Sequence, residues 1–134
     1  MLRSLELKDY MSTQPVRVKP EDEILNAVQQ LLAHKASGAC VIDDGGYLVG
    51  VLSELDCLRA ILSPIYNERP QVGKVEEFMT KEVITVNLHD NVVDVAKDML
   101  EQSHRRRPIV DSNGLLIGQV SCRQLLSAVA NFAS

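Results

Sequence analysis

Two short segments of the chain place a glycine, a serine and a polar side chain at the same spacing. The first, at residues 50–56, reads GVLSELD, and the second, at residues 118–124, reads GQVSCRQ. A serine followed three residues later by an acid or an amide is typical of a capping box, which satisfies the free amides at the start of a helix. A carboxylate there can also accept hydrogen bonds from both hydroxyls of a ribose, while the helix start favours a phosphate. The spacing predicts two helix starts, and a nucleotide-binding role can be added to the structural one.

The two segments differ at their last position. Asp56 offers a charged carboxylate with two acceptor oxygens, whereas Gln124 offers one weaker acceptor oxygen. Ser53 and Ser121 each add a hydroxyl. We therefore expect the Ser53–Asp56 segment to make the better nucleoside site, and the Ser121–Gln124 segment to make a weaker, altered or empty one.

The second half of the chain repeats the first. Residues 7–62 align with residues 75–130 without a gap. The aligned pairs include Met11 with Met79, Asp22 with Asp90, Asp43 with Asp111, Gly50 with Gly118 and Ser53 with Ser121. A unit of this size cannot cover both faces of its own small sheet, so the two copies are expected to pack together.

Each copy predicts the same order of elements. A short acidic and apolar segment ending in Met (residues 5–11 and 75–79) leads into an extended piece (15–18 and 83–86). An amphipathic helix follows, with an apolar stripe expected to face the core: Ile24, Ala27, Val28, Leu31 and Leu32, or Val92, Val95, Ala96, Met99 and Leu100. Two strands joined by a DDGG or DSNG turn come next (39–43 with 47–52, and 108–111 with 115–120). A second helix ends each copy, with apolar positions Leu55, Leu58, Ile61 and Leu62, or Leu125, Leu126, Val129 and Ala130.

The predicted fold is α/β of the α+β type, with two β-α-β-β-α repeats about a pseudo-twofold axis. We expect the first repeat at residues 1–62, a linker bracketed by Pro64 and Pro70 at 63–74, and the second repeat at 75–134. No apolar run approaches the roughly 20 residues of a membrane span, and no export signal is expected at the N-terminus. The cysteines, Cys40, Cys57 and Cys122, form no C-x-x-C pair and are expected to be buried, reduced thiols of a cytoplasmic protein.

These features together resemble a tandem pair of CBS domains, the Bateman module. The resemblance rests on Met11-Ser12 and Met79-Thr80, on an apolar-x-Val strand, on the Val-Asp-x-x-Gly hairpin and on the Gly-x-x-Ser junction of each repeat. It implies a free-standing regulatory module that binds AMP, ADP, ATP, S-adenosylmethionine, or in some members NAD or a cyclic dinucleotide, between the repeats. It also implies a head-to-head homodimer and a regulated partner enzyme, channel or transporter, with a nucleotide as regulatory ligand and no obligatory cofactor.

By the same resemblance, Gly-x-x-Ser-x-x-Asp is the ribose-phosphate motif and each cleft takes its adenine contacts from the opposite repeat. The Asp56 cleft would then use Thr80, Val83, Ile84 and the region of His104, and the other cleft Ser12, Val16 and Ala36. For Ile84 and Val16, packing in the core is the alternative role.

The densest basic run of the chain is His104-Arg105-Arg106-Arg107. Arginine suits phosphate because its planar guanidinium donates two parallel hydrogen bonds. The resemblance implies that Arg105 and Arg106 reach a phosphate, whereas Arg107 precedes the strand and can point elsewhere. A solvated surface or ion pairs with the acids of the chain are equally open.

Other function classes fit the sequence less well. A protein-interaction module without nucleotide binding is the main alternative, because Gln124 replaces the acid of the second repeat. An enzyme is not expected, since the three histidines lack an acid or thiol partner by spacing and no zinc spacing is present. Nucleic-acid binding is not expected from a chain of net charge −4 whose basic run has no interleaved aromatics.

Overall fold

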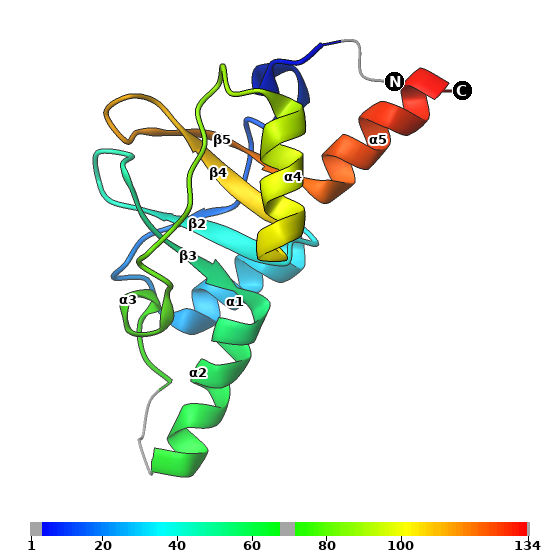
Figure 1. The fold of residues 1–134 in the computed structure, drawn as a ribbon. Helices are drawn as coiled ribbons and strands as arrows, with labels where there is room; N and C mark the ends of the chain where they lie inside the picture. Colours follow the sequence, from blue (N-terminus) through cyan, green and yellow to red (C-terminus); the bar gives the residue numbers. More distant parts are fainter. Residues whose placement is uncertain (1–3, 68–71, 134) are drawn as a thin grey trace. The chain divides into compact units, whose positions relative to one another are not determined.

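The computed structural model describes residues 4–67 and 72–133 and divides the chain into two compact units. We call Pro15–Val83 the first-repeat unit, and Met1–Gln14 with Ile84–Ser134 the second-repeat unit. We call the described residues 4–14 the first arm and residues 75–83 the second arm. Each arm begins one repeat but belongs to the unit that holds the rest of the other repeat (Figure 1).

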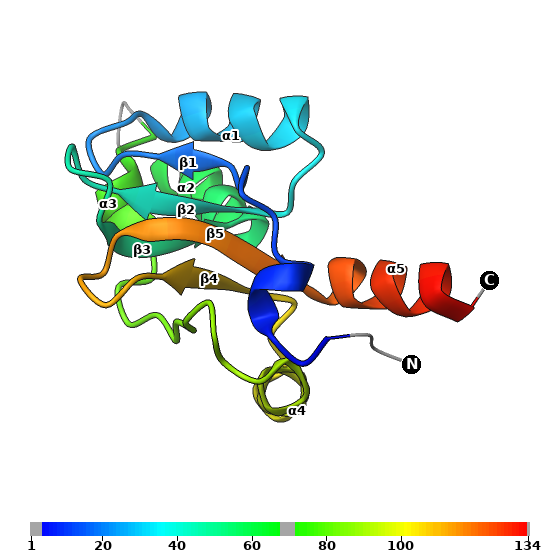
Figure 2. The same ribbon diagram turned by 90° about the horizontal axis from the view of Figure 1, so that it is seen from above.

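The first-repeat unit holds a three-stranded sheet in the order β1-β2-β3. Strand β1 runs parallel to β2, and β2 pairs with β3 as an antiparallel hairpin. Helix α1 packs along the strands through Val18, Ala27 and Val41 (Figure 2). The bounds of its elements are β1 Arg17–Val18, α1 Ile24–Ala33, β2 Gly38–Ile42, β3 Leu48–Ser53, α2 Glu54–Asn67 and α3 Val75–Phe78.

The second-repeat unit holds the hairpin of β4 and β5. The extended piece expected at 83–86 makes a single parallel bridge, Val86 with Ile109, rather than a strand. Pro108 explains the difference: it stands where the first repeat has Cys40, whose amide donates to the Val16 carbonyl at 2.8 Å, and proline has no amide hydrogen to donate. The bounds are η1 Leu7–Tyr10 (a 3-10 helix), α4 Val92–Gln102, β4 Arg106–Val110, β5 Leu116–Ser121 and α5 Cys122–Ala133.

The predicted helices and hairpins are confirmed, but some expected core positions are exposed. On α1, the residues Ile24, Ala27 and Leu31 face the core of the first-repeat unit as the stripe predicts, whereas Leu32 is 73% exposed. Helix α4 repeats this pattern, with Leu100 79% exposed. Both residues close the stripe at the C-terminal end of the helix, where its edge turns toward solvent.

Helix α2 differs most from its prediction. Its expected core residues Leu55, Leu58, Ile61 and Leu62 are exposed, and the small residues Cys57 and Ala60 are buried instead. The largest side chains therefore mark the outer face. The helix also continues through Pro64 to Asn67, because the fixed φ of proline is helical and the cost is the hydrogen bond to the Ala60 carbonyl. Of the cysteines, Cys40 and Cys57 are buried as expected, but Cys122 is exposed at the start of α5.

Each arm is held by backbone hydrogen bonds at matching positions. In the first-repeat unit, Thr80 and Val51 exchange two bonds of 2.9 and 3.0 Å. In the second-repeat unit, Ser12 and Gln119 exchange two bonds of 2.8 and 2.9 Å. The alignment of the two halves of the sequence relates the two pairs, so the duplication extends to the docking of the arms.

Arm and strand approach closely because a glycine lies next to each contact. A Cβ atom on Gly50 would stand 2.8 Å from the Thr80 carbonyl oxygen, and one on Gly118 would collide with the Ser12 carbonyl oxygen. Real Cβ atoms do not come this close. The arm can therefore pair with the strand only because each Gly-x-x-Ser segment begins with a glycine. This glycine lies one residue before the strand residue that pairs with the arm.

Candidate functional site

Helix α2 begins with the predicted capping box. The Ser53 hydroxyl accepts a hydrogen bond from the Asp56 amide at 3.1 Å, and the Asp56 Oδ2 atom accepts one from the Ser53 amide at 2.9 Å. The Ser53–Asp56 spacing thus does what the sequence predicts of it structurally. The capping box also fixes the direction in which the carboxylate points.

The other carboxylate oxygen of Asp56 has a partner that the sequence analysis missed. Arg59 Nη1 lies 3.0 Å from Asp56 Oδ1, in an ion pair one helical turn along α2. The Asp56 side chain is only 12% exposed, whereas that of Arg59 is 68% exposed. The signal was present in the sequence, since an acid and an arginine three residues apart on a helix are neighbours.

Helix α5 begins with a different cap. The Ser121 hydroxyl accepts from the Gln124 amide at 3.2 Å and donates to the Gln124 side-chain oxygen at 3.2 Å. The side chain of Gln124 is thus bonded to the serine hydroxyl instead of to the serine amide. The predicted helix start is confirmed, with a neutral side chain where α2 has a carboxylate.

The arms bring a hydroxyl residue to the strand that leads into each helix start. Thr80 pairs with Val51, two residues before Ser53, and is exposed. Ser12 pairs with Gln119, two residues before Ser121, and is half-buried. The backbone pairing thus places Thr80 beside the strand that leads to Ser53 and Asp56, and Ser12 beside the strand that leads to Ser121.

The basic run lies beside the start of α5. Arg106 pairs with Ser121 across the β4–β5 hairpin, and the Arg105 carbonyl accepts a hydrogen bond from the Cys122 amide at 2.9 Å. Within the second-repeat unit, His104, Arg105 and Arg106 therefore accompany Ser121. Arg105 is exposed, and His104 and Arg106 are half-buried.

Arg107 points into the second-repeat unit. It is 2% exposed, and its Nη2 atom lies 2.6 Å from Asp98 Oδ2 on α4. Its Nε atom donates to His104 Nδ1 at 3.2 Å. Arg107 is a structural ion-pair partner, and its bond to His104 fixes that ring next to the basic run.

The remaining predicted residues are divided between the units. Val16 and Ala36 are half-buried and pack against the core of the first-repeat unit. Val83 is half-buried and belongs to the same unit. Ile84 is 43% exposed and belongs to the second-repeat unit. Core packing is thus one role of Val16, whereas Ile84 presents much of its surface to solvent.

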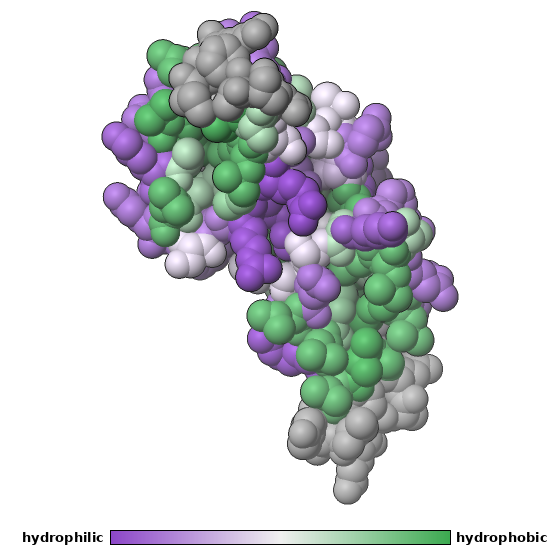
Figure 3. Space-filling model, turned by 90° about the vertical axis from the view of Figure 1, so that its right-hand side faces the viewer, coloured by the Kyte–Doolittle hydropathy of each residue, from purple (hydrophilic) through white to green (hydrophobic). Residues whose placement is uncertain are grey.

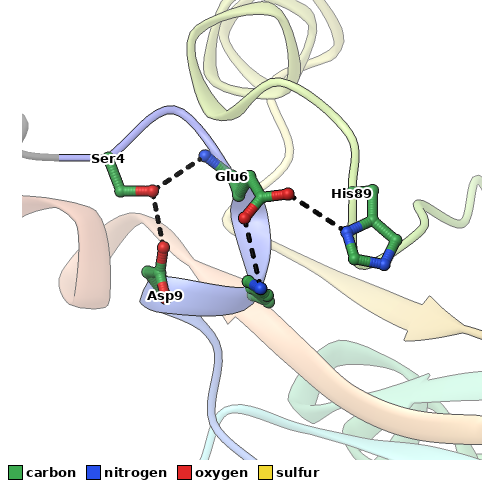
Figure 4. Close-up of polar contacts among 5 residues, drawn as sticks. Ser4, Glu6, Asp9 and His89 are labelled. Carbon is green, nitrogen blue, oxygen red and sulfur yellow. Dashed lines mark hydrogen bonds and ion pairs between the residues drawn. The ribbon is translucent and has the colours of Figure 1, made fainter.

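The first arm carries an exposed polar cluster (Figure 4). Glu6 lies 3.2 Å from His89 Nδ1 and 3.2 Å from Lys8 Nζ. The hydrogen bonds from His89 and Lys8 hold the pKa of the Glu6 carboxyl below its usual value. Ser4 accepts from the Glu6 amide and donates to Asp9, so this cluster ties the arm to the loop before α4.

Residues 4–67 and 72–133 contain no group of three His, Cys, Asp or Glu side chains placed to hold a metal ion. Within the same ranges, no helix is both long and apolar enough to cross a membrane.

Comparison with known sequences decides the family. The profile of the CBS domain matches residues 7–63 and again residues 75–131. The chain belongs to the CBS domain family. The two matches begin at residues 7 and 75, which are the positions at which the two halves of the sequence begin to align.

Curated proteins from two archaea and one plant are similar over most of the chain. An uncharacterized 17.7 kDa protein of Acidianus ambivalens is 34% identical, over 92% of this chain and 73% of its own length. The uncharacterized protein MJ1426 of Methanocaldococcus jannaschii is 30% identical, over 92% of this chain and 90% of its own. The chloroplastic CBS domain-containing protein CBSX2 of Arabidopsis thaliana is 34% identical over 75% of this chain, which spans about half of that protein's length (52%).

Solved CBS structures share the fold. The structure of CBSX2 in complex with AMP superposes with a TM-score of 0.87 at 29% identity, covering 98% of this chain and 100% of that one. The CBS domain pair of protein MJ0100, in complex with 5′-methylthioadenosine and S-adenosylmethionine, superposes with a TM-score of 0.78 at 24% identity, covering 92% and 98%. The second similarity supports the fold alone.

Proposed function

We propose that this CBS pair is a regulatory module that binds an adenosine-containing nucleotide and signals its presence to a partner protein. The similarity to CBSX2, a CBS pair whose structure contains AMP, carries the proposal. The Ser53–Asp56 capping box supports it, because it holds a carboxylate in a fixed direction at the start of a helix. The alternative is an interaction module without a nucleotide. Gln124 of the second repeat is compatible with it, but the similarity to an AMP-bound CBS pair favours nucleotide binding.

The nucleoside end of the site is assigned to Ser53, Asp56 and Thr80 of the first-repeat unit, and Val83 of the same unit is a proposed contact of the base. Asp56 would accept the ribose hydroxyls, and Ser53 and Thr80 would supply hydroxyl groups around it. Ser121 and Ser12 form the corresponding group of the second-repeat unit. That group should bind ribose more weakly, because the neutral Gln124 replaces the carboxylate.

His104, Arg105 and Arg106 are assigned a phosphate-binding role of their own within the second-repeat unit, in the group that contains Ser121. All three lie next to the start of α5, where the helix amides also favour an anion. Arg107 is left out because Asp98 and His104 already engage it. Ile84, Val16 and Ala36 stay proposed contacts of the base.

We propose that the protein binds its ligand without catalysing a reaction. We further propose that it acts in the cytoplasm and that its active form is a homodimer. The buried thiols of Cys40 and Cys57 suit a reducing compartment. A nucleotide shifts the module between two states only by its difference in affinity for them, and the partner enzyme or transporter would respond to that shift.

Isothermal titration calorimetry with AMP tests the proposal, with ATP and S-adenosylmethionine alongside. Asp56→Asn should weaken AMP binding by about tenfold or more, because the amide keeps an acceptor for the Ser53 amide but loses the charge and one ribose acceptor. Asp94→Asn, an equal charge change on the exposed face of α4, should leave binding unchanged. Failure of the unmodified protein to bind any of the three ligands would instead favour the interaction module.

A further inference from the structure

Each oxygen of the Asp56 carboxylate has a partner within the chain. The Ser53 amide holds Oδ2 at 2.9 Å as part of the helix cap, and Arg59 holds Oδ1 at 3.0 Å. The capping bond is part of the fold of α2 and stays. A carboxylate oxygen can accept two hydrogen bonds, but a ribose hydroxyl that approaches Oδ1 meets the Arg59 guanidinium there and competes with it.

We propose that Arg59 is a specificity-determining residue, which blocks Asp56 against uncharged nucleosides and releases it to nucleotides that carry a phosphate. This inference rests on the proposed function and deepens it, because it states which adenosine ligands the site prefers. Arg59 acts through its ion pair with Asp56.

The geometry allows Arg59 to leave. Its side chain is 68% exposed, so the freed guanidinium is hydrated as soon as it swings away. An ion pair with one exposed partner is weak, so a ligand can compete with it. Asp56 is only 12% exposed and needs a replacement donor, which the ribose hydroxyls supply. After this exchange Asp56 still has a hydrogen-bond donor at Oδ1, whereas Arg59 has lost its ion pair.

The charge of the ligand decides whether Arg59 finds a new ionic partner in place of Asp56. Adenosine displaces Arg59 and offers the freed cation nothing in return. In the proposed site, the 5′-phosphate of a nucleotide whose ribose binds Asp56 would bring a dianion to the start of α2, and a guanidinium binds phosphate through two parallel hydrogen bonds. Glu54 places a further negative charge at this helix start, so a phosphate there needs a nearby cation. Arg59 supplies one from the same helix.

The second repeat has no equivalent of this pair. The alignment of the two halves places Gln124 on Asp56 and Ser127 on Arg59, so neither the acid nor the cation is present there. A preference set by this pair therefore belongs to the first repeat, and it should fall when Arg59 alone is changed.

Titration calorimetry of AMP and adenosine on the full chain tests the inference, because the two ligands differ only in the phosphate. Arg59→Gln should bind adenosine about threefold more tightly and AMP about threefold more weakly, so that the preference for AMP over adenosine falls about tenfold. Arg59→Lys keeps the charge and should retain most of the preference. Lys97→Gln, which removes one exposed cation from α4, is the matched control and should retain all of it.

The outcomes separate this inference from the proposed function. AMP binding with an unchanged preference in Arg59→Gln would overturn the role of Arg59 and leave the nucleotide site in place. Binding of neither ligand to the unmodified protein or to Arg59→Gln would overturn both. Adenosine binding that is gained only in Arg59→Gln would support the block directly. The melting temperature of each variant, measured without ligand, shows that the fold is intact.

Discussion

The thiols of the three cysteines differ in exposure, and this difference predicts their reactivity. Cys122 is exposed on the first turn of α5, whereas Cys40 and Cys57 are buried. Burial, and then the negative charges of Asp56 and Glu54, raise the pKa of the Cys57 thiol. We expect iodoacetamide to alkylate Cys122 at least about ten times faster than Cys57 at neutral pH, measured by peptide mass spectrometry. Cys122→Ser should remove the fast phase, and rapid labelling of Cys57 would contradict the buried position of its side chain.

At the residue scale, the sequence predicts the pairs that lie close along the chain. Ser53 with Asp56 and Ser121 with Gln124 are three residues apart, so the helix start itself brings them together. Arg59 obeys the same local rule and could have been found. The exposed position of Cys122 could also have been found, because Ser121 and Arg123 flank it and the alignment of the two halves places it on Glu54, in the first turn of a helix.

The docking of the arms depends on Gly50 and Gly118, and this can be tested by alanine substitution. In Gly50→Ala, the new Cβ atom would press on the Thr80 carbonyl oxygen and on Met79 Sδ, at 2.8 and 2.9 Å. Thr80 is fixed by two hydrogen bonds to Val51, so the strain has no easy release. We expect the free energy of unfolding to fall by about 1–3 kcal/mol, measured by urea denaturation. Gly118→Ala should cost at least as much, because its Cβ atom would collide with the Ser12 carbonyl oxygen.

Gly45→Ala is the matched control for these two variants. Its Cβ atom would meet the ring of Tyr47, which is 43% exposed and can turn aside, and would lie in ordinary van der Waals contact with Asp43 Oδ1 at 3.4 Å. We expect a change of less than about 0.5 kcal/mol, the usual range for a surface substitution. If Gly45→Ala and Gly50→Ala lower the free energy of unfolding equally, the contact between Gly50 and the second arm does not explain the loss at Gly50.

At the scale of elements, periodicity predicts the helices and the hairpins but not every face. The hairpins follow from turn chemistry, and α1 and α4 follow from their apolar stripes. The strand expected at 83–86 is reduced to one bridge because Pro108, in the facing strand, lacks an amide hydrogen. The stripe on α2 indicates the wrong face because the residues that fit against the sheet, Cys57 and Ala60, are smaller than those left outside. Pairing of the arms is non-local, so no pattern within one repeat reveals it.

At the scale of the whole molecule, the outer face of α2 carries an apolar surface without a partner among the described residues of this chain. The α2 stripe consists of Leu55, Leu58, Ile61 and Leu62, with exposures of 69%, 54%, 37% and 39%. Figure 3 shows apolar side chains gathered at the level where Figure 1 places α2. Contiguous exposed apolar surface of this kind is typical of a protein interface. A second copy of the chain is the occupant that we propose, in keeping with the proposed homodimer.

Light scattering coupled to size-exclusion chromatography tests the dimer. Leu58→Glu/Leu62→Glu should convert it to a monomer, because burying two carboxylates in an apolar interface costs more than the contact contributes. Leu100→Glu, on the exposed face of α4, is the matched control and should leave the dimer intact. A dimer that survives the α2 changes but dissociates with Leu100→Glu would place the interface on α4. A monomer in the unmodified protein would leave the α2 stripe to the regulated partner, whose binding the same double variant should then abolish.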